Sequence, residues 1–597
     1  MALLLAMSAH GLVTSPARVY ADSPSGENEP GSETRRPFRL PFAEPPGPDT
    51  WLIAQPYGNT TGAYYQRHSL YGASGGIHFG VDLAAPCGTE IVAIADGVVF
   101  AVDGPYGSAP HNLMIDHPQL GYASMYGHLL EAPDLQPGQE VKAGEVIALV
   151  GDSDGNCHRR PHLHLEIRDL RYHARKYNPA ALIEANWDSL ALVGDAGRTF
   201  MRDLAEPRKW QTLYTQPEVW TGGPIINDFA DTWPLDWSKR ESSLARLPGL
   251  AKITPAPTQT IAVDPASWRP AGKQITRGDC CTQPYWDHDS TEVRFIDQPG
   301  PDAALGVWGV DLTQPEGKPH LVTQRLAVYS PDGTMLAYPD RNRGLAIIER
   351  LEDGQRWEVD TQGHGVSFTP DSQRLIWVTY DEDEAWDTRE ETLWLADLDG
   401  KNARPLFSAQ RTDLVAWLSD DELLMVRSFE ETSDVQLFKL SLTDGLQTLL
   451  KTGPGMRGLA LSPDRRRLVY YVRFEPDASQ NGVWLMDVQD LTQAPEKLPF
   501  FGAYRWRDRQ HLIYVPFDPE ATSHDFYEYN VLTGHTRPLF PSGTNLTIAN
   551  NDWQVSPDGR KIALVAARGT ALDGIWVLNI ASGPTQKPDL LVDKLKK

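Results

Sequence analysis

Four histidines and one aspartate in the first third of the chain are of the residue types that hold a metal ion and move a proton. His78 and Asp82 stand four positions apart, and His162 and His164 stand two apart in the segment HLHLE. Alternate side chains of a strand point to the same side, so a strand here would aim both imidazoles at one spot. Imidazole and carboxylate together suit Zn²⁺, whose catalytic sites use three protein ligands and leave a fourth position for water. Bound zinc lowers the pKa of that water to about 7 and polarises a carbonyl, which is the chemistry of amide hydrolysis near neutral pH.

His128, in the segment SMYGHL, is a further histidine that could hold this water or stabilise a developing oxyanion. Each motif alone is weak, because HxH and HxxxD arise by chance in long chains and a single histidine is more often structural. The motifs occur here in one β-rich domain, in one order, with glycine-rich turns between them. That conjunction predicts a zinc hydrolase.

The same conjunction closely resembles peptidase family M23, the lysostaphin and LytM type, over residues 75–180. The segments that carry the resemblance are GIHFGVDLAAPCGTEIVAIADGVV, SMYGHL, PGQEVKAGEVIALVG, PHLHLEIRD and a trailing Asn178-Pro179. The resemblance implies one Zn²⁺ per chain, held by His78, Asp82 and His164. It also implies that His128 and His162 orient or deprotonate the water and stabilise the oxyanion. Family members are exported enzymes that cut peptides, chiefly in the cross-links and stems of peptidoglycan, so such peptides are the expected substrate.

The loop before PHLH departs from the family pattern. The family usually has a Gly-Thr-Gly-type loop there, whereas this chain has GDSDGNCHRRPHLH, lengthened from Asp152 to Arg160. The ligands are intact, but one wall of the cleft is altered, so the peptide that this chain prefers within the family's substrate class stays open. Arg159 and Arg160 are either a solvated basic pair or partners for a carboxylate of an acidic stem peptide. His158 is a candidate accessory ligand, although that role is not favoured. His117 and His68 are expected to be structural, and Asp96 is expected to be a turn residue.

Some relatives in the family have lost these ligands and act as activators of cell-wall amidases. All five positions are present in this chain, namely His78, Asp82, His128, His162 and His164. Loss of catalysis is therefore not expected here.

The chain has four cysteines, too few for a disulfide scaffold. Cys87 and Cys157 each sit beside a histidine-bearing motif, so they either form a disulfide that ties two active-site loops or remain two thiols. Cys280 and Cys281 are adjacent and either form a vicinal bridge or stay free.

Length and composition bound the fold class. A chain of 597 residues is too long for one core and allows roughly three or four domains. The 18 Trp and 21 Tyr favour strands, and the whole is expected to be a multidomain all-β protein. A formal net charge of −24 argues against nucleic acid as a partner, because phosphate binding needs a basic face.

The N-terminus reads as an incomplete signal peptide over residues 1–21. An apolar stretch from Ala2 to Val13 leads to Val19-Tyr20-Ala21, a small-residue cleavage pattern, although a basic leading region is missing. No later apolar run approaches the roughly 20 residues that span a bilayer, so no transmembrane segment is expected. The expected location is secreted or extracytoplasmic, in the cell envelope. Residues 22–50, rich in Pro, Gly, Ser and charge, are expected to be a disordered linker.

Residues 51–190 carry the chemistry on short apolar-alternating segments broken by Gly and Pro, which predicts strands. One short helix is expected around Pro179 to Glu184. Residues 191–283, rich in Pro and Trp, are a connecting segment to which the pattern assigns no fold.

From residue 284 to 582 the chain repeats itself about every 40–50 residues, the spacing of a four-stranded propeller blade. The repeats are SPDGTMLAY from Ser330, TPDSQRLIWV from Thr369, LSDDELLMV from Leu418, SPDRRRLVYYV from Ser462, RDRQHLIYV from Arg507, SPDGRKIALV from Ser556, and a worn copy, WDHDSTEVRFI, from Trp286. They resemble the SPDG repeat of TolB-like propellers and predict seven blades, with six as the alternative. Residues 583–597 would be a tail. A propeller of this kind could bind a protein or a wall glycan.

The sequence therefore predicts an exported zinc metalloendopeptidase with a propeller for binding or targeting. A secreted peptidase for peptides or proteins outside the wall is one alternative. A non-enzymatic envelope scaffold, in which the first domain only binds peptide, is the other.

Overall fold

The computed structural model describes most of the chain from residue 36 to residue 580. The described ranges are 36–158, 160–194, 211–226, 272–277, 280–281, 283–300, 302–314, 317–324, 327–340, 342–381, 384, 388–429, 432–540 and 546–580. The expected signal peptide (1–21), the tail (583–597), the linker up to residue 35 and much of the connecting segment lie outside them.

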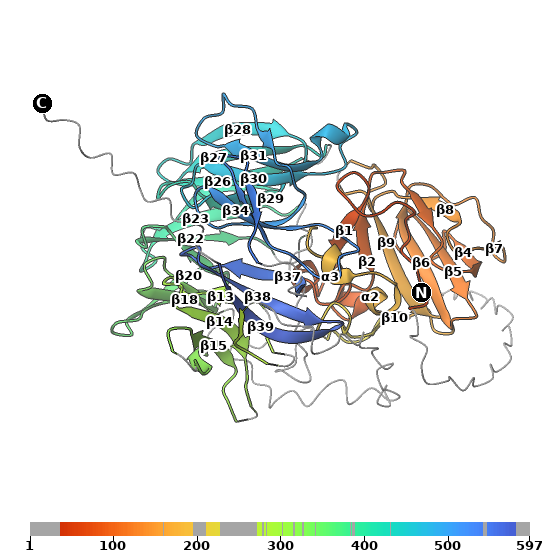
Figure 1. The fold of residues 1–597 in the computed structure, drawn as a ribbon, viewed down its shortest axis with the longest axis horizontal. Coiled ribbons are helices and arrows are strands. Elements are labelled where there is room, and N and C mark those ends of the chain that lie inside the picture. Colours follow the sequence, from red (N-terminus) through yellow and green to blue (C-terminus); the bar gives the residue numbers. More distant parts are fainter. Residues whose placement is uncertain are drawn as a thin grey trace, which may run out of the picture. The chain divides into compact units, whose positions relative to one another are not determined.

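The N-terminal domain is built on one sheet, in the order β1-β2-β9-β6-β5-β4-β7 (Figure 1). β10 lies beside β9, and β11 lies beside β10. A separate pair, β3 and β8, packs near it. The strands of this domain are β1 (Leu52–Gln55), β2 (Val81–Ala84), β3 (Glu90–Val92), β4 (Gly97–Val102), β5 (His111–His117), β6 (Tyr122–Leu129), β7 (Glu140–Val141), β8 (Val146–Leu149), β9 (His162–Asp169), β10 (Arg175–Tyr177) and β11 (Val219–Trp220).

The helices of this domain are short. They are α1 (Thr61–Tyr65), the 3₁₀ turn η1 (Gly72–Ser74), α2 (Pro179–Leu182) and α3 (Trp187–Leu190). The expected helix at Pro179 is α2: Asn178 caps it by accepting the N–H of Ala180, and Pro179 at the first helical position has no N–H to satisfy. None of the helices in the described ranges is long and apolar enough to cross a bilayer.

Strand β9 shows how the sequence divides the sheet into a core face and a polar face. Leu163, Leu165 and Ile167 are fully buried and belong to the main hydrophobic core of the domain. The side chains of His164, Glu166 and Arg168 alternate with them and point to the other face. The alternation in HLHLEIRD therefore holds the two histidines on one side of a rigid strand.

Residues 36–50 differ from the linker that their composition predicts. Phe38 and Phe42 are buried in the domain core together with Trp51, and Phe38 forms a β-bridge with Ile183. Two aromatic side chains bury enough apolar surface to fix a segment that is otherwise polar and Pro-rich.

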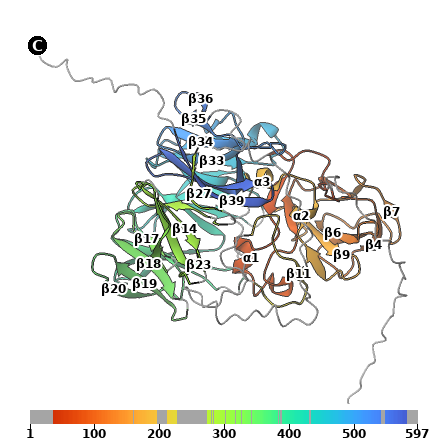
Figure 2. The same ribbon diagram turned by 60° about the horizontal axis from the view of Figure 1, so that its bottom comes forward.

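The C-terminal part is a seven-bladed propeller, as predicted; the six-bladed alternative is wrong. Seven sheets each contain four antiparallel strands, and Figure 2 shows β17 to β20 of one blade side by side. The first three blades are β13 (Tyr285–Trp286), β14 (Glu292–Asp297), β15 (Gly306–Asp311) and β16 (His320–Thr323); β17 (Val328–Tyr329), β18 (Met335–Asp340), β19 (Leu345–Arg350) and β20 (Arg356–Asp360); and β21 (Val366–Phe368), β22 (Arg374–Thr379), β23 (Glu391–Asp397) and β24 (Arg404–Ala409).

The next three blades follow the same order along the chain. They are β25 (Thr412–Trp417), β26 (Glu422–Ser428), β27 (Val435–Ser441) and β28 (Gln447–Gly453); β29 (Arg457–Leu461), β30 (Arg467–Val472), β31 (Gly482–Asp487) and β32 (Glu496–Lys497), with the 3₁₀ turn η4 (Ala478–Gln480); and β33 (Gly502–Trp506), β34 (His511–Pro516), β35 (Tyr527–Asn530) and β36 (Thr536–Pro538).

The last blade closes the ring with strands from both ends of the propeller. β37 (Thr547–Val555), β38 (Lys561–Arg568) and β39 (Ala571–Asn579) come from its end, and β12 (Gly272–Gln274) pairs antiparallel with β39. β12 lies in the stretch for which the sequence predicts no fold, because three residues of Gly-Lys-Gln show no apolar alternation.

The repeated S/T-P-D turns have one recurring hydrogen-bond pattern. Ser330 Oγ donates to Asp332 Oδ1 at 2.6 Å and accepts the N–H of Met335 at 2.9 Å. The same pair of bonds recurs at Thr369, Ser462 and Ser556. These aspartates therefore shape the turn that starts each buried strand, which is a structural role.

The two domains share a packed and hydrogen-bonded contact at α3. The Asp188 carboxylate accepts the N–H of Asn550 at 2.9 Å, and Ser189 Oγ lies 2.9 Å from Nε2 of the buried His524. Leu52 and Leu192 belong to the same hydrophobic cluster as the strands of the last blades. The propeller thus packs directly on the N-terminal domain.

Candidate metal centre

Strands β2 and β9 bring three predicted ligands together. Asp82 and His164 are directly opposite each other in the antiparallel register, and His78 lies just before β2. Oδ1 of Asp82 is 3.2 Å from Nε2 of His78 and 2.7 Å from Nδ1 of His164. The two nitrogens are 3.4 Å apart.

This triangle of donor atoms fits Zn²⁺. Bonds of about 2.0–2.1 Å in a tetrahedral site place neighbouring donors about 3.3–3.4 Å apart. Two of the three donor separations, 3.2 and 3.4 Å, match that spacing, and the third, 2.7 Å, is a hydrogen bond that a metal would replace. Two imidazoles and one carboxylate are also the ligand types of catalytic zinc sites.

The orientation of His78 is fixed from outside the site. Its Nδ1 lies 2.8 Å from the carbonyl oxygen of Pro56, so Nδ1–H donates there and Nε2 keeps a free lone pair toward Asp82. His78 is almost completely buried. A backbone acceptor behind a histidine ligand is the usual way in which a protein selects the metal-binding nitrogen.

Gly80 makes room for the ring of His164. A Cβ at this position would lie 2.6 Å from Cε1 and 2.7 Å from Nε2 of His164, both shorter than real Cβ contacts. The second glycine in GIHFGVD is therefore required for steric reasons, because it provides the space in which the imidazole of His164 lies.

His128 and His162 lie together beside the triangle, with ring centroids 4.8 Å apart. Nδ1 of His128 donates to the carbonyl of Ala109 at 2.5 Å, and Nδ1 of His162 donates to the carbonyl of Arg160 at 2.6 Å. Each ring thus keeps Nε2 as the free nitrogen, and Nε2 of His162 lies 4.0 Å from Oδ1 of Asp82. His128 also has a left-handed backbone, with φ of 59°, a conformation that costs on the order of 1–3 kcal/mol and clusters at functional sites.

Burial and charge act in opposite directions on these groups. Burial alone would raise the pKa of Asp82, but the charges of His78 and His162 hold that pKa well below its usual value. Burial likewise lowers the pKa of His164, yet the hydrogen bond and charge of Asp82 raise it to about 9. Burial, followed by the charges of His162 and His164, lowers the pKa of His128 to about 4. His128 is therefore a neutral proton acceptor at pH 7.

Sequence reasoning missed a buried charged cluster behind His164. Arg168 donates to both carboxylate oxygens of Glu166, at 2.9 and 2.8 Å, and Lys176 Nζ lies 3.6 Å from Glu166 Oε2. Burial would raise the pKa of Glu166, but the charges of Arg168 and Lys176 hold it far below its usual value. The alternation in HLHLEIR could have placed Glu166 and Arg168 on the histidine face, whereas Lys176 comes from the neighbouring strand β10.

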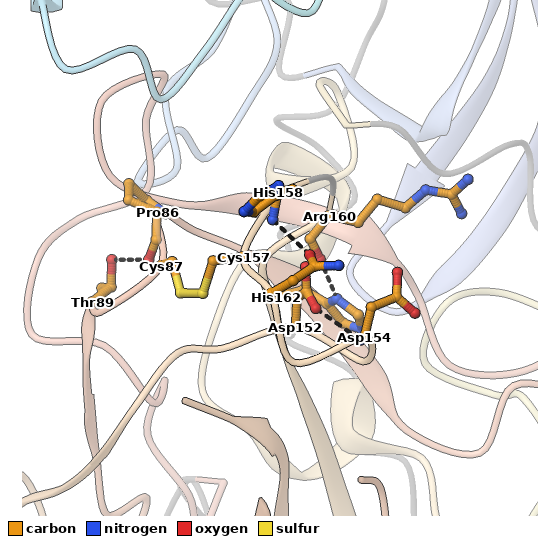
Figure 3. Close-up of a disulfide and its surroundings, with 10 residues drawn as sticks. Pro86, Cys87, Thr89, Asp152, Asp154, Cys157, His158, Arg160 and His162 are labelled. Atoms are coloured by element: carbon orange, nitrogen blue, oxygen red, sulfur yellow. Dashed lines mark hydrogen bonds between the residues drawn. A yellow bond between two sulfur atoms is a disulfide. The ribbon is translucent and has the colours of Figure 1, made fainter. Parts of the chain in front are cut away.

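A disulfide joins the two loops that flank the site (Figure 3). Cys87 follows β2 and Cys157 precedes β9, and their Cα atoms are 5.8 Å apart. The bridge holds the lengthened loop, in which Asp152 Oδ1 accepts the N–H of Asp154 at 2.8 Å. In Figure 3 the Arg160 side chain extends away from the disulfide, and Arg159 lies outside the described residues.

The remaining histidine and aspartate candidates lie apart from the triangle. His117 is fully buried and bonds to the carbonyl of Asp96 and to Ser124 Oγ, both at 2.8 Å, as expected of a structural residue. Asp96 accepts the N–H of Ala143 at 2.8 Å and so shapes a turn. His158 and His68 are exposed in loops.

Cys280 and Cys281, whose state the sequence left open, are joined to each other by a disulfide and are buried at the junction of the last and first blades.

Comparison with known proteins identifies the family of the N-terminal domain. Residues 76–179 match the model of peptidase family M23. Over 118 residues the chain is 36% identical to the DD-carboxypeptidase/endopeptidase Mpg of Neisseria meningitidis, covering 19% of this chain and 24% of that protein. Over 110 residues it is 39% identical to the murein hydrolase activator NlpD of Salmonella dublin, covering 18% of this chain and 27% of NlpD. The chain thus spans about a quarter of the length of these relatives.

A solved structure of a propeller domain aligns with half of this chain. The β-propeller domain of the Trilobed protease from Pyrococcus furiosus aligns with 50% of this chain and 94% of its own, at 13% identity and a TM-score of 0.36. The propeller assignment rests instead on the seven four-stranded sheets of this chain. Residues 76–179 are therefore a peptidase family M23 domain, which this chain joins to a seven-bladed β-propeller.

Proposed function

We propose that this protein is an exported zinc metalloendopeptidase that hydrolyses peptide bonds in peptidoglycan cross-links or stem peptides. The observation that carries the proposal is the triangle of His78, Asp82 and His164 donor atoms, with separations of 2.7–3.4 Å, beside two further histidines. His78 Nε2, Asp82 Oδ1 and His164 Nδ1 would hold one Zn²⁺.

Bound zinc would supply Lewis-acid chemistry, polarising a substrate carbonyl and making a water more acidic. The protein residues move the protons. Because Nδ1 of His128 and of His162 is committed to a backbone carbonyl, Nε2 of each is the atom that exchanges a proton. Neutral His128 accepts a proton from water and can return it to the leaving amine. A protonated imidazole in this position donates a hydrogen bond to the developing oxyanion.

The substrate class is supported by the relatives. Mpg is named for carboxypeptidase and endopeptidase activity and NlpD for activation of murein hydrolases. Both similarities are confined to the peptidase domain, so the wall peptide as substrate and the envelope as location are proposals for this chain.

The propeller is proposed to bind a protein or a wall glycan and so to place the peptidase near its target. Its direct contact with α3 supports this, because a ligand on the propeller would then hold the active site at a fixed distance. If a chain without residues 272–580 bound and cleaved walls as well as the full chain, this role would be excluded.

The enzyme proposal is tested on the full chain with purified peptidoglycan and with a glycine-rich peptide. Wild type should contain one zinc by elemental analysis and release peptides whose masses identify the bond, and His162→Ala should retain zinc without activity. A zinc-free wild type, or an unchanged His162→Ala variant, would refute the enzyme proposal. Cleavage of the glycine-rich peptide alone would favour a peptidase acting outside the wall.

Activation of a separate wall amidase is a second candidate, favoured by the likeness to NlpD. It predicts that wild type and His162→Ala stimulate a purified amidase equally. The complete set of five site residues favours the peptidase instead.

A further inference from the structure

Nε2 of His164 is a buried polar atom with an unusual environment. It makes no hydrogen bond to any of the residues that the structure describes. Oε1 of Glu166 lies 3.5 Å from it, and the two residues are two positions apart on the same face of β9. The other ring nitrogen, Nδ1, faces Asp82 and His78. The ring thus presents one nitrogen to the ligand triangle and the other to Glu166.

The Glu166 carboxylate is held in place on its other sides. Both of its oxygens accept hydrogen bonds from Arg168, and Arg168 also donates to the carbonyl of Tyr106 at 2.5 Å. Lys176 Nζ, 3.6 Å from Oε2, is itself fixed by Thr221 Oγ1 at 2.7 Å and lies over the Phe79 ring at 4.3 Å. Since Glu166 is fully buried, it has no access to water as an alternative partner.

The other side of the His164 ring is equally constrained. Phe79 packs edge-on against it, with ring centroids 5.2 Å apart, and Gly80 leaves no space for a further atom. The ring therefore cannot turn to exchange its two nitrogens without disturbing packed groups.

We propose that Glu166 is a positioning residue of the metal centre, whose carboxylate accepts Nε2–H of His164 and so reserves Nδ1 for the metal. This inference rests on the proposed zinc-dependent function. A carboxylate behind a histidine ligand fixes the tautomer and makes the ligand more basic. Arg168 of the same strand donates to both oxygens of this carboxylate and holds it in place, so β9 supplies both the ligand and its support.

A purely structural role is the competing explanation, in which Glu166 only neutralises two buried cations. Zinc affinity distinguishes the positioning role from the purely structural role, because a change in charge balance alone should not alter the affinity for zinc. Lys176→Met disturbs the charge balance and leaves the contact between Glu166 and His164 in place. Glu218→Gln is the matched control, since Glu218 lies directly before β11 and its carboxylate pairs with Arg175 of β10 at 2.5 Å.

The experiment measures the zinc dissociation constant of the full chain by competition with a chromogenic chelator, and the visible spectrum after Co²⁺ substitution. Glu166→Gln should weaken zinc binding roughly 10–100-fold and alter the Co²⁺ bands. Lys176→Met and Glu218→Gln should leave both within about threefold of wild type, even where the melting temperature falls.

If wild type binds one zinc tightly and Glu166→Gln binds it equally well, the role of Glu166 is overturned and the proposed function stands. A wild type that binds no zinc would overturn both. If Glu166→Gln fails to fold, Glu166→Asp takes its place, because the shorter carboxylate still neutralises Arg168 but withdraws from Nε2. Its affinity should fall at least about tenfold, and unchanged affinity would count against the proposal.

Discussion

Asp82 and His164 face each other across β2 and β9, and Oδ1 of Asp82 lies 2.7 Å from Nδ1 of His164. Nδ1–H donates to the carboxylate, and this bond, with the charge of Asp82, raises the pKa of His164 to about 9 against the opposing effect of burial. The same nitrogen must lose its proton to become a ligand. The proton and the metal thus compete for one atom.

Zinc binding should accordingly release about one proton from His164 at pH 7. Because the raised pKa means that the ring is protonated below about 9, the apparent zinc affinity should rise with pH up to that value, about tenfold per unit. Calorimetry in buffers of different ionisation enthalpy measures the released proton. Zinc content and activity should fall together below about pH 6. Full zinc retention at about pH 4.5 would contradict the ligand set.

His128→Ala and His162→Ala should each lower kcat by roughly 10²–10⁴ while zinc content stays at that of wild type, because these rings move protons and are not ligands. Activity assays and elemental analysis on the same samples check this. His173→Ala is the control, since His173 bonds to Asp116 at 3.2 Å in a turn beyond β9. Loss of zinc in either variant would make that histidine a ligand instead.

Gly80→Ala should weaken zinc binding at least about tenfold, because the added Cβ would lie 2.6 Å from the His164 ring and displace a ligand. Overpacking of this kind also costs about 1–3 kcal/mol of stability. Gly47→Ala is the matched control, as the nearest atom to its Cβ would be 3.7 Å away. Chelator competition gives the affinity of both; equal affinities would show that the ring has room to move.

Replacing Cys87 and Cys157 together by Ala should raise KM more than it lowers zinc affinity, because the bridge holds the loop that walls the cleft. The two cysteines are 70 residues apart, and a loop of that length predicts about 4 kcal/mol of stabilisation from chain entropy. Urea unfolding with and without a reducing agent checks the second point. The reducing agent should destabilise wild type and should have a smaller effect on the variant, which keeps only the bridge between Cys280 and Cys281.

Asp188→Asn should gain stability relative to wild type as pH rises. Burial raises the pKa of Asp188 to about 7, despite the N–H of Asn550 and the charge of Arg36. Between about pH 4 and 7 the unfolded chain ionises this group first, so wild type loses stability with rising pH and the variant does not. The difference between variant and wild type should change by about 1–4 kcal/mol from pH 4 to pH 8.

Urea unfolding of both proteins at each pH measures this difference. Burial lowers the pKa of the neighbouring His524 to about 4, which makes both proteins less stable as pH falls below about 6.5, and comparison at equal pH removes that effect. Asp302→Asn on the surface is the control. A difference for Asp188→Asn that does not change with pH would show that the group stays ionised at the contact.

Much of the fold follows from local pattern. The S/T-P-D turns are visible because each needs a hydroxyl and a carboxylate at fixed spacing, and HLHLE shows its two faces because a strand alternates. β12 was not predictable, since its pairing with β39 depends on a partner about 300 residues away and not on its own three residues. Phe38 and Phe42 were hidden for a related reason: two apolar residues in a polar segment reveal burial only once Trp51 and Ile183 are placed beside them.

The residues of the site likewise fall into those that the sequence predicts and those that it does not. The resemblance to family M23 predicts that His78, Asp82 and His164 meet, and the structure brings them together. Their role as ligands remains a prediction. Glu166 stands in the motif, yet its link to Lys176 depends on β10 pairing with β9, which no spacing reveals. The hydrogen bonds of His128 to Ala109 and of His162 to Arg160 involve backbone carbonyls, so residue types could not predict them.

The pairing of β12 with β39 sets the order in which the molecule can be completed. β12 is synthesised well before its partner β39, so the ring cannot close until β39 has also been made. The same last blade carries Asn550, which holds Asp188 of α3. A chain shortened before β39 would therefore lose both the closure of the ring and the last-blade support for the peptidase domain.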